Sequence, residues 1–81
     1  MITVLFFAQV RERIGCERIT LEAAFATVEA LRASLAARGG NWAQALEPGR
    51  LLTAVNQVLV DSGHPLSAGD EVAFFPPVTG G

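Results

Sequence analysis

Two apolar stretches in the first quarter of the chain predict a pair of strands. Residues 2–7 (ITVLFF) are mostly β-branched or aromatic, and Thr3 is the one polar residue among them, a composition typical of a central strand. Residues 17–22 (ERITLE) alternate with period two, which predicts a half-buried strand. The intervening residues 8–14 suit a short helix or loop that Gly15 ends, so the two strands are expected to pair as a hairpin.

A helical pattern follows. Thr27 is a suitable N-cap and Glu29 falls in the first turn, where the helix dipole favours a carboxylate. Apolar residues then recur at helical spacing, and Arg38 with Gly39-Gly40 should close the helix. This segment predicts one long helix, whose apolar face consists of Val28, Leu31 and Leu35.

The second half of the chain alternates short strands with turns. Asn41 is expected to cap a short helix over 42–46, which Pro48-Gly49 stops, and Asn56-Gln57 predicts a turn. Pro76-Pro77 should end the last strand because proline cannot donate to a ladder. Three strands are predicted here, over residues 51–55, 58–60 and 71–75.

This order predicts an α+β fold, a mixed sheet of four or five strands with one long helix on one face. One helix covers one face only, and both faces of the first and last strands carry large apolar residues. Phe7, Leu59 and Phe75 are therefore expected to form an apolar docking surface, with Arg11 and Val78 at its edge. The alternative is that loops or the short helix cover this face and that these residues belong to the core.

Composition limits the function. The 81 residues suffice for one small domain, too small for a deep, enclosed active site, so the chain is not expected to be catalytic alone. Apolar residues make up 51% and charged residues 17%, against about 25% charged in an average domain. Part of the apolar surface is therefore expected to be exposed to a protein partner.

Charge and cysteine content exclude further classes. The net charge is −2 and the six arginines form no run, which argues against nucleic acid and acidic membrane surfaces as partners. The apolar opening is too short to span a bilayer. A lone Cys16 without a disulfide partner fits a cytoplasmic protein.

Few side chains suggest chemistry. Cys16 is more simply a small hydrophobic residue than a nucleophile, and His64 has no second ligand at metal-binding spacing, so no metal site is expected. Asp70 and Glu71 are adjacent in or beside a strand and point to opposite faces. No phosphate-binding loop or catalytic triad is present. The remaining reactive group is the C-terminal carboxyl of Gly81.

The chain ends in FFPPVTGG. This end, the preceding GDEVA, the AVNQ and HPL segments and the opening VLFFA with Arg11-Glu12 together resemble the small subunits of molybdopterin synthase, a family of β-grasp (ubiquitin-like) sulfur carriers. The resemblance covers the whole chain, whereas Gly-Gly alone is shared with the thiamine sulfur carrier and with ubiquitin-like modifiers. It implies a domain over 1–77 followed by a flexible tail over 78–81 (Val78, Thr79, Gly80, Gly81).

The resemblance also implies a mechanism. An adenylating enzyme uses ATP to activate Gly81, a sulfur donor protein converts it to a thiocarboxylate, and the tail enters the large subunit, where sulfur passes to cyclic pyranopterin monophosphate. No cofactor is expected on this chain itself, and a heterotetramer of two small and two large subunits is inherited from the family. Glycine suits such a tail because it has no Cβ to clash in a channel. Three alternatives stay open: a thiamine-type carrier, a protein modifier, and a plain interaction module.

Overall fold

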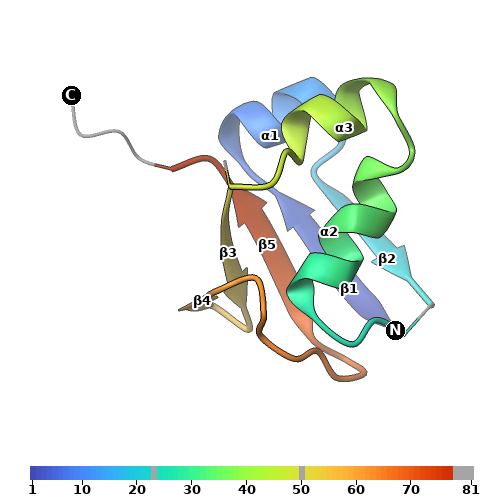
Figure 1. Ribbon diagram of the computed structural model, residues 1–81, viewed down its shortest axis with the longest axis vertical. Coiled ribbons are helices and arrows are strands. Elements are labelled where there is room, and N and C mark those ends of the chain that lie inside the picture. Colours follow the sequence, from blue (N-terminus) through green and yellow to red (C-terminus); the bar gives the residue numbers. More distant parts are fainter. Residues whose placement is uncertain (23, 50, 78–81) are drawn as a thin grey trace.

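The computed structural model describes residues 1–22, 24–49 and 51–77. Within them lies a five-stranded mixed sheet, in the order β2-β1-β5-β3-β4, made by β1 (Ile2–Phe6), β2 (Arg18–Leu21), β3 (Leu52–Val55), β4 (Val58–Val60) and β5 (Glu71–Phe75) (Figure 1). The first and last strands, β1 and β5, pair in parallel at the centre, and the other neighbours are antiparallel. The predicted α+β fold and the central position of the first strand are confirmed.

The helix expected to be long is shorter than the sequence suggested. The described residues form α1 (Ala8–Ile14), α2 (Val28–Ala36) and α3 (Gly40–Ala45), so the expected single long helix is not found. As predicted, Thr27 caps α2: its Oγ1 accepts a hydrogen bond from the Ala30 N–H at 3.2 Å. The N–H groups of Arg38 and Gly39 bond back three residues, to the carbonyls of Leu35 and Ala36, which tightens the last turn and ends the helix early.

The expected cap of the short helix was also wrong. Gly39, not Asn41, is the N-cap residue of α3, and no side chain caps this helix. Gly39 and Gly40 have φ values of 78° and 54°, in the left-handed region that glycine adopts without a Cβ penalty. The two glycines therefore turn the chain directly from α2 into α3.

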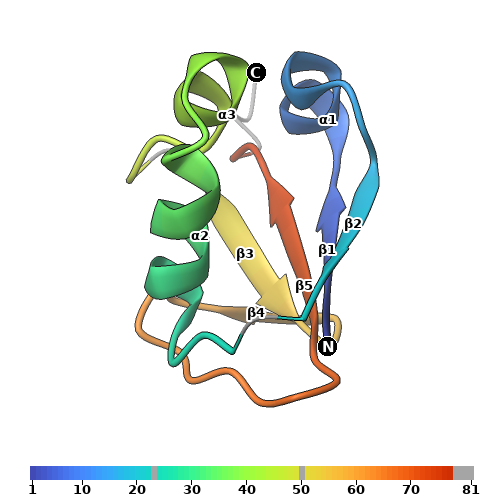
Figure 2. The same ribbon diagram turned by 90° about the vertical axis from the view of Figure 1, so that its right-hand side faces the viewer.

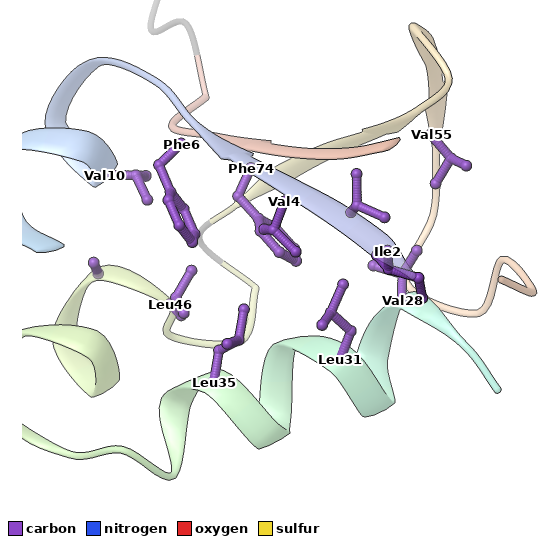
Figure 3. Close-up of a cluster of buried hydrophobic side chains, with 12 residues drawn as sticks. Ile2, Val4, Phe6, Val10, Val28, Leu31, Leu35, Leu46, Val55 and Phe74 are labelled. Carbon is purple, nitrogen blue, oxygen red and sulfur yellow. The ribbon is translucent and has the colours of Figure 1, made fainter. Parts of the chain in front are cut away.

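All the fully buried apolar residues lie between one face of the sheet and the helices (Figure 3). α2 crosses this face, and α1 and α3 contact each other at the end of the sheet where β1 and β5 finish (Figure 2). Phe6 stacks on Phe74 with ring centroids 6.4 Å apart and meets Trp42 edge-on at 5.6 Å. The sheet contributes Ile2, Val4, Phe6, Val55, Val72 and Phe74 to the core, and the helices contribute Val10, Val28, Leu31, Leu35 and Ala45, with Leu46 next to α3.

A polar network fixes the end of the sheet opposite to α1. Asn56 and Gln57 both have positive φ, 51° and 71°, as a tight hairpin turn between β3 and β4 requires. The Asn56 side chain donates to Asp70 Oδ1 at 3.0 Å and accepts from the Glu71 N–H at 3.0 Å. Asp70 Oδ2 in turn accepts from the Ser67 N–H at 2.8 Å. Asp70 thereby joins two turns that are distant in sequence.

This network predicts an acid-sensitive contribution to stability. The Ser67 N–H first, and then the Asn56 side chain, hold the pKa of Asp70 below its ordinary value. Because the folded-state pKa is depressed, the contribution is complete above the unfolded pKa of about 3.9 and is lost as the pH falls through the folded value. Urea unfolding between about pH 6 and pH 2 should show this loss in the native chain and a smaller one in Asp70→Asn.

The matched control is Glu12→Gln, since Glu12 is an exposed carboxylate on α1 for which the described structure shows no hydrogen bond or ion pair. If Asp70→Asn follows the same pH dependence as the native chain and the control, the network does not stabilise the fold.

Candidate protein-docking site

The second face of the sheet carries no helix in the described part of the chain. Strand register places four apolar side chains in one row across this open face. Leu5 of β1 pairs with Ala73 of β5, Ala73 with Ala54 of β3, and Ala54 with Leu59 of β4. Leu59 and Val58 are both 63% exposed, but Val58, like Val60, pairs with a residue of the buried face. The middle of the open face is therefore flat and apolar, with a leucine on each side.

Three further side chains, those of Phe75, Leu52 and Phe7, extend this surface toward the end of β5. Phe75 pairs with Leu52, and both are half-buried on the open face. Phe7 follows β1, donates its N–H to the Phe74 carbonyl at 3.2 Å and is 46% exposed. We refer to these residues together as the apolar patch: Leu5, Phe7, Leu52, Ala54, Leu59, Ala73 and Phe75.

The opposite end of the same face is polar. Thr3 pairs with Thr20 on one side and with Glu71 on the other, and the Asn56 network follows. Polarity therefore changes along β5, from Glu71 at its start to Phe75 at its end. Pro76 and Pro77 leave the sheet directly after Phe75, so the apolar patch adjoins the point from which the chain continues to its C-terminus.

The chain turns sharply where Phe7 is presented. Ala8 has φ 52°, a left-handed value that is uncommon for a residue with a Cβ. Phe7 itself is extended and is the N-cap residue of α1, without a side-chain cap. The strain at Ala8 therefore lies at the junction that sets Phe7 at the edge of the patch instead of inside the helix pair.

Arg11 supplies a positive charge one helical turn after Phe7. Its N–H bonds to the Phe7 carbonyl at 3.4 Å. Its guanidinium lies 3.8 Å from Glu17, and the side chains are 50% and 76% exposed. A pair this open to solvent contributes little to stability, so Arg11 keeps most of its capacity to bind an external carboxylate or carbonyl.

The structure thus places Phe7, Leu59 and Phe75 on one surface, with Arg11 beside Phe7. Their role in binding stays a prediction. The tail residues Val78, Thr79, Gly80 and Gly81, and hence the proposed boundary after residue 77, lie outside the described residues. Sequence reasoning did not single out Leu5 and Leu52. Leu5 alternates with the buried Val4 and Leu52 with the buried Thr53, and this alternation could have indicated both residues. The pairing of Leu52 with Phe75 is a tertiary feature that the sequence does not reveal.

Other candidate residues have structural surroundings. Cys16 is partly buried and packs against the core. The His64 carbonyl accepts the Val28 N–H at 3.0 Å at the start of α2. Within the described ranges no three His, Cys, Asp or Glu residues come together as metal ligands would, and no helix has the length and apolarity needed to cross a bilayer.

A β-grasp sheet with one apolar open face, which adjoins the departing C-terminal segment, is the architecture of a small protein-docking domain. Comparison with known proteins specifies the class. The chain belongs to the ThiS family, whose model matches residues 4–81.

Two curated relatives confirm the resemblance found in the sequence. The molybdopterin synthase sulfur carrier subunit of Escherichia coli is 64% identical over 81 residues, and that of Haemophilus influenzae is 58% identical over 81 residues; both alignments cover each chain completely. Among solved structures, a complex of subunits 1 and 2 of the molybdopterin-converting factor from Helicobacter pylori contains a chain that superimposes with a TM-score of 0.69 at 30% identity. The match covers 99% of this chain and 97% of that one.

Proposed function

We propose that this protein is the sulfur carrier subunit of a molybdopterin synthase. In this role the Gly81 carboxylate is adenylated, converted to a thiocarboxylate, and used to deliver sulfur to cyclic pyranopterin monophosphate for the dithiolene of molybdopterin. The full-length similarity to two sulfur carrier subunits supports the proposal. The chain itself would bind no cofactor, and the reaction would take place in the cytoplasm.

The observation that carries the proposal is the position of the apolar patch. A carrier must hold its partner with a folded body while its last residues reach the partner's active site. The patch ends at Phe75, and Pro76-Pro77 begin the segment that leaves the sheet. Four further residues, extended at about 3.3–3.6 Å each, reach roughly 13–14 Å beyond Pro77. Docking by the patch would therefore place Gly81 well inside a partner.

Two partners would use the same patch in turn. The large subunit would receive the loaded tail, and an adenylating enzyme would bind ATP and activate the unloaded one, before a sulfur donor protein supplies the sulfur. The carboxylate needs this activation because it is ionised at neutral pH and carries no leaving group. The Helicobacter pylori complex of subunits 1 and 2 supports the first partner.

Loading of the chain with sulfur tests the proposal. The purified chain is incubated with ATP, an adenylating enzyme and a sulfur source, and its intact mass is then measured. We expect a gain equal to the replacement of one oxygen by sulfur, located at Gly81 by fragmentation. If the mass stays unchanged under conditions that load the Escherichia coli subunit, the chain is not a sulfur carrier and the patch serves another interaction.

Arg11 gives a further prediction. Arg11→Ala should leave the free energy of unfolding within about 0.5 kcal/mol of the native value, because its pair with Glu17 is open to solvent. The same substitution should weaken binding to the large subunit several-fold. Calorimetric titration and urea unfolding measure the two effects, and Arg38→Ala, which removes a positive charge after α2 on the helix-covered side of the sheet, is the control. Equal affinities of Arg11→Ala and the native chain would remove Arg11 from the docking site.

A further inference from the structure

A second surface feature lies on the helical side of the molecule and is distinct from the open face of the sheet. A hollow of about 810 Å³ opens between α1 and α3, a size typical of sites for small ligands. We call it the α1–α3 groove. Apolar residues of its lining include Ala45 and Leu51, and polar ones include Gln9, Arg13 and Gln44.

The root of the C-terminal segment belongs to the same groove. Pro76 and Pro77 are among its lining residues, together with Ala8 at the start of α1. The Phe7 N–H bond to the Phe74 carbonyl keeps the start of α1 beside the end of β5. The four residues that follow Pro77 therefore begin at the edge of the groove.

Arg13 supplies a positive charge to the lining of this groove. Gln9 and Arg13 are four residues apart on α1 and thus share one helix face. Among the described residues Arg13 has no ion-pair partner. Glu47 is the one carboxylate among the described lining residues; it follows α3 and has an interaction of its own. The guanidinium of Arg13 is therefore the group that an anion in the groove would meet.

The C-terminal segment after Pro77 is long enough to reach Arg13. From Ala8 to Arg13 the rise along α1 is about 7.5 Å, at 1.5 Å per residue. Four extended residues span roughly 13–14 Å. A chain that turns back at Pro77 consequently has enough length to bring its terminal carboxylate to Arg13.

We propose that the α1–α3 groove binds the chain's own C-terminal segment, residues 78–81, with the Gly81 carboxylate at Arg13, whenever no partner is docked. This resting state adds to the proposed function, but the docking itself does not depend on sulfur loading. A thiocarboxylate is also an anion, so the loaded segment would bind in the same way. A partner that docks on the apolar patch would then compete with the groove for the segment.

Nuclear magnetic resonance of the free protein tests the docking without ATP or partners. We compare the full chain with a variant that lacks Gly80 and Gly81, at low salt. Removal of the two residues should shift the Arg13 Nε–H signal and the backbone amides of Gln44 and Ala45, which lie across the groove from α1. High salt should produce the same shifts in the full chain, because the ion pair is exposed. Unchanged signals at Gln44 and Ala45 would overturn the proposal.

Carboxypeptidase digestion provides a second readout. Gly81 should be released about two- to fivefold faster from Arg13→Gln than from the native chain, the effect expected for one exposed ion pair. Arg13→Lys should restore slow release, and Arg18→Gln, which makes the same charge change on β2 outside the groove, should have no effect. Equal rates in all four proteins, or equal acceleration by Arg13→Gln and Arg18→Gln, would contradict docking at Arg13. Failure here leaves the loading experiment unaffected.

Discussion

Deletion of Gly81 should abolish sulfur transfer while the chain still folds and binds the large subunit. The deletion moves the terminal carboxylate back by one residue, about 3.5 Å. A misplacement of even 1 Å at a reacting centre can cost about 10²-fold in rate, so loading should fall by at least about 10²-fold. Intact-mass analysis after incubation with the adenylating enzyme measures this loss, and titration against the large subunit measures the binding that remains.

Gly81→Ala is the matched variant for this deletion. It keeps the length of the chain and the carboxylate but adds a Cβ, so it tests whether a channel requires the absence of a side chain. We expect its loading to be reduced, but less than in the deletion. Full activity of the deletion variant would show that sulfur transfer does not require the terminal carboxylate to stand at position 81.

Phe74→Ala should mainly reduce stability and Phe75→Ala should mainly reduce binding to the large subunit, because these neighbours face opposite sides of the sheet. Phe74 is fully buried and stacked on Phe6, so its truncation should cost about 3–5 kcal/mol of unfolding free energy. Phe75 lies in the apolar patch beside Leu52. Its truncation should cost about 1 kcal/mol of stability but weaken binding to the large subunit by about 2 kcal/mol, roughly 30-fold.

Urea unfolding and calorimetric titration of the two variants measure these effects. Each variant is the control for the other, since both remove the same atoms from the same strand. A Phe75→Ala chain that binds normally would show that the open face does not dock the large subunit, whatever happens at Gly81.

Local patterns sufficed to predict most strands and helix starts. The runs over 2–7 and 71–75 contain β1 and β5, and Thr27 caps α2 as expected. The end of α2 and the cap of α3 could not be read in this way. Both depend on how Gly39 and Gly40 turn the chain, and on the packing of α3 against α1 and α2. The parallel pairing of the first and last strands is likewise a tertiary feature, and it entered the prediction only through the family resemblance.

The docking site was predictable in part, because local alternation of residues along the strands indicates which side chains share a face. Alternation separates Phe75 from Phe74 and Leu59 from its neighbours, so the sequence indicated two apolar faces. It did not indicate which face the helices cover. The helices pack on the face that carries Val72 and Phe74, and the register of β5 against β1 and β3 then places Leu5, Ala73 and Leu52 together on the other face. The α1–α3 groove has no sequence signal, because its lining comes from three separate segments.

Transfer of labelled sulfur tests the central claim most directly. The chain is loaded with isotopically labelled sulfur, purified, and mixed with the large subunit and cyclic pyranopterin monophosphate, without further ATP or sulfur donor. The account predicts that the label leaves Gly81, that the chain returns to the mass of its carboxylate, and that the label appears in the dithiolene of molybdopterin. Label that stays on the chain, or is released without entering the pterin, would contradict it.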